Sequence, residues 1–372
     1  MSGGIVVKAT TPQEAVRAVE AFMARMVALG LRQHLRLRPA EPNAPHAVAF
    51  ALQEAEARCW APGSDTLQLC ARLRLDTRAC ADDLAREILL AMLLSPSPLV
   101  FPSWEELESA VRMRQAIVQA ARRTAMNFHT TQIERPAEDW RYAAASGFTL
   151  RAGRPLIPAL QRATQPALAT QAYSFSCYRA TEYVILLAIA QEAQLVNPGL
   201  LSRLQRQWES RAIMSRRFHE VFLREHGSLE APLPITYYIP GDRVWFRNPD
   251  SDSADVAGFE GSWVVYLGAG QFPNFWRRER PYSLLAKCVE VYHWRHGTYR
   301  DAAGELQMDE ERVDQLVAQT LQDPAARERV FERMFRLRDP GGVYAGGGCM
   351  DATRESPRWV RPQTVDIELS EA

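Results

Sequence analysis

The pattern of apolar and polar residues changes along the chain between the period of a strand and the period of a helix. The first part mixes the two, and Pro12 stands where a proline favours a helix start. The predicted elements are a strand at residues 4–9, a helix at 11–31, and strands at 33–38, 46–57 and 66–75. The sequence therefore predicts a small α+β unit over residues 1–75.

Helical spacing dominates the next part of the chain. Ser103, followed three residues later by Glu106, has the form of a capping box that opens a helix. The predicted helices cover residues 76–94, 104–125, 180–193 and 198–225.

Strand-like runs then return, separated by turn sequences rich in Gly, Pro, Asn and Asp. The runs lie at residues 235–239, 242–247 and 263–267, and helical spacing resumes at 283–296 and 310–336. The pattern predicts a second domain over residues 76–338 and a Gly- and Pro-rich C-terminal arm over 339–372.

The segment Tyr173–Cys177 runs directly into an apolar helical stretch. A thiol in the first turn of a helix meets unpaired backbone N–H groups and the positive end of the helix dipole, which favour the thiolate. A small buried cysteine is the alternative explanation. A helix that carries a thiol and packs on a later antiparallel sheet is the plan of papain-like folds, so we expect an α+β fold of this type.

The composition of the chain bears on its partners, its location and its need for a metal or cofactor. The 372 residues include 44 basic and 44 acidic side chains, so net charge does not favour nucleic acid or a membrane surface as a partner. Apolar runs are too short to span a bilayer, and the start lacks a signal-peptide pattern, so we expect a cytoplasmic protein. The six cysteines are widely spaced without a zinc-site pattern, so we expect no metal and no cofactor.

Several motifs in a fixed order resemble the bacterial, spore-coat type of protein-glutamine gamma-glutamyltransferase, a transglutaminase with a papain-like core. The resemblance covers roughly residues 80–310. The segments that carry it are 87–96, 103–108, 147–150, 173–177, 218–219, 240–250, and Gly261 with 267–270.

The resemblance implies that Cys177 is the nucleophile, and it places His219 at a histidine of the family pattern. Three other positions depart from that pattern. Ser176 replaces a glutamate before the cysteine, Ser262 replaces a glutamate that assists it, and Phe275 stands where the family has a histidine. The nucleophile position is thus kept, whereas the matched acid–base groups are lost.

The sequence leaves two functions open, and with them whether the chain is an enzyme at all. The first is acyl transfer from a protein glutamine through a Cys177 thioester to a lysine amine or water, by cross-linking or deamidation. The second is a catalytically degenerate scaffold, a pseudoenzyme that binds a protein partner. A thiol protease would share the first chemistry and differ in the acyl acceptor. A protein substrate or partner is expected in every case, and the oligomeric state is left undetermined.

Overall fold

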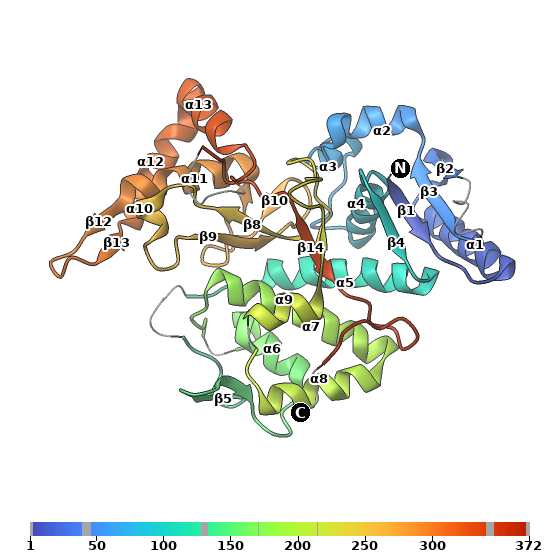
Figure 1. Cartoon of the computed structure of the whole chain (residues 1–372), viewed down its shortest axis with the longest axis horizontal. Helices are drawn as coiled ribbons and strands as arrows, with labels where there is room; N and C mark the ends of the chain where they lie inside the picture. The colour runs from blue at the N-terminus through green and yellow to red at the C-terminus, as the bar shows by residue number, and fades with distance from the viewer. Residues whose placement is uncertain are drawn as a thin grey trace.

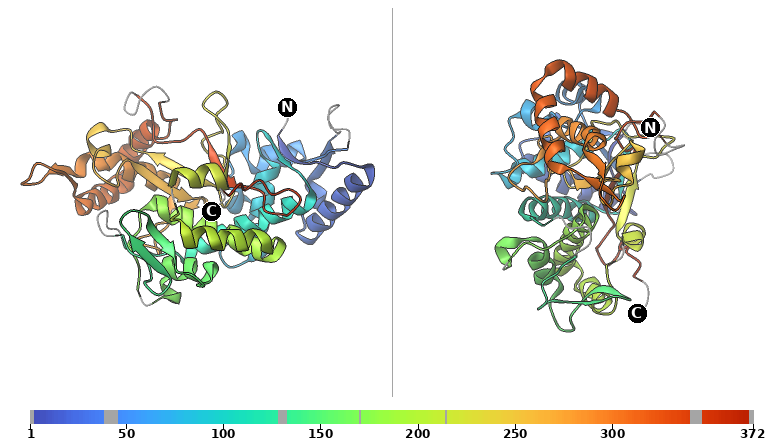
Figure 2. Two further views of the ribbon diagram at one scale, coloured as in Figure 1. Left: turned by 60° about the horizontal axis from the view of Figure 1, so that its bottom comes forward. Right: turned by 90° about the vertical axis from the view of Figure 1, so that its left-hand side faces the viewer.

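Two long helices, α5 (Trp104–Arg123) and α7 (Cys177–Val196), pack against each other at the centre of the chain (Figure 1). The computed structural model describes residues 3–38, 46–127, 133–169, 171–213, 215–339 and 346–369. The two four-stranded sheets lie on one side of α5, and α6, α7 and α8 lie on the other side (Figures 1 and 2).

The N-terminal sheet has the strand order β2-β3-β1-β4. Its strands are β1 (Gly4–Val7), β2 (Leu35–Arg38), β3 (Val48–Leu52) and β4 (Pro98–Phe101). Strand β1 is antiparallel to β3 and parallel to β4, so the sheet of the N-terminal unit is completed by a strand from beyond residue 75. Helix α1 (Pro12–Ala28) covers the sheet, and Phe22 stacks on Phe50 with ring centroids 3.9 Å apart.

The second sheet has the order β7-β14-β8-β9 and is antiparallel throughout. Its strands are β7 (Leu223–His226), β8 (Arg243–Arg247), β9 (Gly261–Val265) and β14 (Arg354–Pro357). Strand β14 comes from the C-terminal segment and lies between β7 and β8 (Figure 1). Residues 354–357 are all buried, so this part of the segment belongs to the body of the protein.

The remaining elements surround these two sheets. The helices are α2 (Glu54–Trp60), α3 (Leu69–Leu73), α4 (Ala81–Leu93), α6 (Leu156–Thr164), α8 (Pro198–Ser210), α9 (Ser215–Phe222), α10 (Ser251–Ala254), α11 (Leu284–Gly297), α12 (Glu310–Gln322) and α13 (Pro324–Met334), with short 3-10 turns at Arg32–His34, Pro62–Ser64 and Pro166–Leu168. Three small hairpins pair β5 (Trp140–Ala143) with β6 (Gly147–Leu150), β10 (Gln271–Phe272) with β11 (Tyr282–Ser283), and β12 (Thr298–Arg300) with β13 (Leu306–Met308).

The predicted strands at 4–9, 33–38, 242–247 and 263–267 and the predicted helices at 11–31, 76–94, 104–125, 180–193 and 283–296 are confirmed within a few residues at their ends. Ser103 caps α5 as the capping box predicts, accepting a hydrogen bond from the Glu106 N–H. The predicted α+β unit over residues 1–75 includes residues 39–45, which lie outside the described residues.

Other predicted elements were wrong. The predicted strand at 66–75 is the helix α3, and the predicted strand at 46–57 gives way to α2 after Leu52. The long predicted helix at 198–225 is divided into α8, α9 and the strand β7. The one at 310–336 is divided into α12 and α13, because Asp323 caps the N-terminus of α13.

The apolar run at 235–239 is not a strand because its polar backbone groups and tyrosines find partners elsewhere. The Tyr238 N–H donates to the Thr66 hydroxyl, and the Tyr237 hydroxyl donates to the Ala91 carbonyl. Both rings are buried, so the β-branched and aromatic composition reflects core packing rather than strand pairing.

A buried ion pair joins α5 to the start of β8. The Arg114 Nη1 lies 2.7 Å from the Asp242 carboxylate and also donates to the Pro240 carbonyl. Gly241 has φ +89°, and a Cβ there would meet the Arg114 Cα at 2.9 Å. Only glycine fits this close approach without strain, which explains the Pro-Gly-Asp sequence in structural terms.

The C-terminal segment is held on α5 by Glu106. This fully buried carboxylate accepts hydrogen bonds from the backbone N–H groups of Val360 and Arg361 and from the Thr364 hydroxyl. Because a carboxylate with several donors is strongly stabilised, Glu106 fixes the path of the chain after β14.

We predict that Glu106→Ala lowers the free energy of unfolding by about 2–4 kcal/mol, because it leaves buried backbone donors unpaired. Chemical denaturation measures this loss. Glu105→Ala, one residue earlier and outside this set of bonds, serves as the control. Equal unfolding midpoints for Glu106→Ala and the control would contradict the assigned role of Glu106.

Candidate active site

Cys177 is the first residue of α7, in agreement with the position that the sequence predicts. Ser176 is the N-cap, and its hydroxyl accepts a hydrogen bond from the Arg179 N–H. Ser176 has extended backbone angles, as N-cap residues usually do, so the chain changes direction here and α7 begins at Cys177. Helix α7 packs against β9, so the thiol lies between a helix N-terminus and a strand.

The thiol opens into a cavity of about 110 Å³. Cys177 itself is partly exposed. The cavity is lined on one side by β9 and the turn before it and on the other by the segment from Asn274 to α12. The polar and charged lining side chains are Ser262, Asn274, Arg277, Tyr282, Lys287, Glu290, Glu310 and Asp314.

Two ion pairs lie at this cavity. The Lys287 Nζ is 2.8 Å from the Glu290 carboxylate and 3.8 Å from the centre of the Tyr282 ring. Lys287 is buried, so its charge is poorly screened. Arg277 and Asp314 form the second pair, with 2.5 Å between Nη1 and Oδ2.

Burial raises the pKa of the Cys177 thiol. The backbone N–H of Trp263, the Lys287 ammonium and the Tyr178 N–H act in the opposite direction, because each stabilises the thiolate. The resting state at neutral pH is therefore a thiol placed among groups that favour its ionised form.

The three positions that depart from the pattern implied by the resemblance lie in different surroundings. Ser262 lines the cavity with Cys177, so the strand brings this position to the thiol. Ser176 is exposed and serves as the helix cap. Phe275 is 1% exposed, and it is its neighbour Asn274 that lines the cavity. None of these three side chains can act as a general acid or base at neutral pH.

His219 does not line the cavity of Cys177. Its Nδ1 lies 2.7 Å from the buried Glu355 carboxylate on β14. The other oxygen of that carboxylate accepts a hydrogen bond from Arg243 at 2.7 Å, and Arg243 Nε donates to the Thr181 hydroxyl on α7. The hydrogen bond and charge of Glu355 raise the pKa of His219.

Arg243 connects this histidine network to the thiol. Its guanidinium stacks on the Trp263 ring at 3.9 Å and on the Tyr178 ring at 4.5 Å. Tyr178 and Trp263 are also the residues whose backbone N–H groups act on the Cys177 sulfur. His219 is thus joined to the thiol through Glu355 and Arg243.

The sequence reasoning missed Lys287, Glu290, Tyr282 and Asn274. A signal was present for Lys287, which interrupts the apolar stretch from Leu284 to Val289. A buried charge in an apolar helix face requires a partner, and Glu290 is placed one turn later. Nothing in the sequence, however, indicates that this turn of α11 faces Cys177.

Metal chemistry has no candidate site in the part of the chain that the structure describes. Those residues contain no group of three or more His, Cys, Asp or Glu side chains that could hold an ion. None of the described helices is both long enough and apolar enough to cross a bilayer.

A sequence model of the family described as protein-glutamine gamma-glutamyltransferase matches residues 69–368. This chain belongs to that family. The family accounts for the α+β transglutaminase-like fold, and the match extends past the C-terminal strand β14. The expectation of a resemblance over residues 80–310 is therefore confirmed and extended in both directions.

Comparison with solved structures finds a transglutaminase from Geobacillus stearothermophilus without its C-terminal extension. It is 17% identical, with a TM-score of 0.38 over 58% of this chain and 98% of that chain. No curated protein matches the chain by sequence. The family assignment rests on the sequence model.

We predict that iodoacetamide alkylates Cys177 slowly at neutral pH and faster as the pH rises, because burial raises its pKa. Lys287→Met removes a charge that favours the thiolate, so we expect alkylation at pH 8 to fall about 3- to 10-fold. Peptide mass spectrometry measures both rates. Lys8→Met is the control, since Lys8 lies outside the cavity. A faster rate in Lys287→Met would contradict the role given to this ammonium.

For His219 we predict a pKa above that of an ordinary histidine, falling toward the ordinary value in Glu355→Gln. A raised folded-state pKa stabilises the fold below the unfolded pKa, and this stability is lost as pH rises through the folded pKa. NMR titration of the imidazole in the wild-type protein and in Glu355→Gln measures the shift. An unchanged His219 titration in Glu355→Gln would rule out the pairing in solution.

Proposed function

We propose that this protein transfers the acyl group of a protein glutamine through a thioester on Cys177. The observation that carries the proposal is the opening of the Cys177 thiol, at the N-terminus of α7, into a cavity that also holds the Lys287–Glu290 pair. The family match supports protein substrates, because glutamine in proteins is the acyl donor that the family description names.

Each step conserves atoms and protons. The Cys177 sulfur attacks the carboxamide carbon and forms a tetrahedral intermediate. The C–N bond then breaks, ammonia leaves, and a thioester remains. A lysine amine attacks that thioester to give an isopeptide bond and the free thiol, and attack by water gives glutamate instead.

We assign the proton transfers to Glu290 and the electrostatic stabilisation to Lys287. Glu290 takes the proton of the thiol and returns it to the leaving ammonia, while the Lys287 ammonium favours the thiolate. This pair comes from α11 and replaces groups lost at Ser262 and Phe275. The N–H groups near the sulfur, from Trp263 and Tyr178, are candidates to stabilise the oxyanion.

The charges at the cavity suit an amine acceptor. Lys287 and Arg277 are positive, whereas Glu290, Asp314 and Glu310 are negative, which leaves one negative charge in excess. A lysine side chain that approaches as an ammonium ion is therefore attracted rather than repelled.

The alternative is a degenerate scaffold that binds a protein partner without chemistry. Two observations favour it: the pKa of the Cys177 thiol is raised, and three family positions are substituted, at Ser176, Ser262 and Phe275. In that case the cavity is a remnant of the ancestral site, and Cys177→Ala leaves the activity of the protein in cells unchanged.

We predict that the purified protein incorporates a biotin-tagged alkylamine into dimethylated casein and that Cys177→Ala abolishes this activity. Glu290→Gln lowers the rate by about 10²-fold, the typical loss of an acid–base group. Blotting with streptavidin measures incorporation, and Cys59→Ala, an exposed cysteine elsewhere, is the matched control.

Two results would contradict the proposal. Full activity in Cys177→Ala would remove the thioester, and activity equal to wild type in Glu290→Gln would remove the assigned base. Absence of incorporation by the wild-type protein, together with unchanged function of Cys177→Ala in cells, would favour the scaffold.

A further inference from the structure

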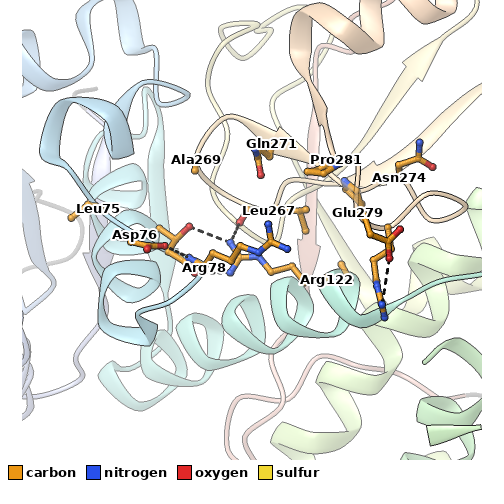
Figure 3. A pocket seen from close by; sticks show the side chains of 14 residues that line it. Leu75, Asp76, Arg78, Arg122, Leu267, Ala269, Gln271, Asn274, Glu279 and Pro281 are labelled. Carbon is orange, nitrogen blue, oxygen red and sulfur yellow. Dashed lines mark hydrogen bonds and ion pairs between the residues drawn. The ribbon is translucent and has the colours of Figure 1, made fainter. Parts of the chain in front are cut away.

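A second cavity, of about 290 Å³, lies beside the candidate active site and is lined by three arginines. Figure 3 shows Arg78, from the turn before α4, and Arg122, from α5, on one side of it, with the loop that carries Asn274, Glu279 and Pro281 on the other. Arg278 is the third arginine. The volume is near the lower end of the range, about 300–1,000 Å³, of typical ligand sites.

Arg122 lines this cavity, and among the described residues it forms no ion pair with a carboxylate. Its guanidinium donates to the carbonyl and hydroxyl of Thr77 and to the Leu267 carbonyl, and these are all neutral acceptors. Burial lowers the pKa of Arg122, and the positive charge of Arg78 acts in the same direction, whereas the carboxylates of Glu87 and Asp76 act against it. Arg78 and Arg122 line the same cavity, so an anion bound there would be attracted by both guanidinium groups.

The two acidic side chains of the lining already have partners, and the partner of Glu279 is Arg278 of the same cavity. The Asp76 carboxylate accepts hydrogen bonds from the backbone N–H groups of Arg78 and Ala79. Glu279 lies 3.5 Å from Arg278 in an exposed pair. Three arginines against Asp76 and Glu279 leave one positive charge in excess, which suits a single carboxylate better than a doubly charged phosphate.

Asn274 connects this cavity to the candidate active site, because it lines both of them. It is buried, and its side-chain amide donates to the Tyr282 hydroxyl at 2.7 Å. Its carbonyl oxygen accepts from the backbone N–H groups of Trp276 and Arg277. The two cavities therefore lie next to each other, with Asn274 between them.

We propose that the cavity lined by Arg78, Arg122 and Arg278 is a subsite for an aspartate or glutamate side chain next to the reactive glutamine of the substrate protein. The proposal rests on the function proposed above in one respect, namely that the glutamine occupies the Cys177 cavity. Selection of an acidic neighbour would then give the enzyme specificity among protein glutamines.

Binding without turnover tests this subsite. The background is Cys177→Ala, so that no thioester forms. The probes are two short fluorescein-labelled peptides, one with a glutamine followed by two aspartates and the other with two asparagines in their place. Fluorescence anisotropy at low salt should show about fivefold tighter binding of the aspartate peptide. The preference should disappear at 0.5 M NaCl, because salt screens exposed charges.

Variants locate the preference. Arg78→Gln combined with Arg278→Gln should abolish it and leave binding of the asparagine peptide unchanged. Both side chains are exposed, so this variant is not expected to disturb the core. Arg123→Gln, the exposed neighbour of Arg122 that does not line the cavity, should keep the full preference.

The result that overturns the proposal is equal affinity for the two peptides in the Cys177→Ala background, or an unchanged preference in the double arginine variant. Tighter binding of a phosphoserine peptide than of the aspartate peptide would also overturn it, in favour of a phosphate site. Since amine incorporation is measured separately, acid-selective binding without incorporation rejects only the enzymatic function, and incorporation without acid selectivity rejects only the subsite.

Discussion

The buried guanidinium of Arg243 is the interaction on which the arrangement of the site depends. It joins β8, where it originates, to Glu355 on β14 and to Thr181 on α7, and it stacks on Trp263 of β9. A buried guanidinium is costly unless it is paired, so the bonds of Arg243 Nε and Nη1 hold these elements in one arrangement. That arrangement places the first turn of α7, and with it Cys177, against β9.

The C-terminal segment takes part in this constraint because β14 is an inner strand of the sheet. Glu355 provides the only carboxylate that Arg243 contacts among the described residues, and the same carboxylate holds His219. The chain after β14 is then fixed on α5 by Glu106. A segment that composition alone presents as a Gly- and Pro-rich arm is therefore part of the structure that positions the thiol.

The proposed chemistry and the proposed subsite share one physical feature, the loop between β9 and α11. In this loop Phe275, at the position where the resemblance implies a histidine, is buried in the core, and Asn274 lines both cavities. The next helix, α11, contributes the charged pair Lys287 and Glu290 to the lining of the Cys177 cavity. The proposed chemistry uses this pair in place of the groups that the resemblance implies at the matched positions.

The sequence by itself determined the elements with strong local signals and the family of the chain. The capping box at Ser103, the helix after Cys177 and the strand-like run at β8 are set by neighbours in the chain, so local patterns reveal them. The tertiary structure decided where long-range partners lie. Residues 235–239 have strand composition but bond to Thr66 and Ala91. Lys287 lines the cavity of Cys177 because α11 packs against β8, the strand next to β9. Such contacts join residues far apart in sequence, and their energies depend on burial that no local pattern encodes.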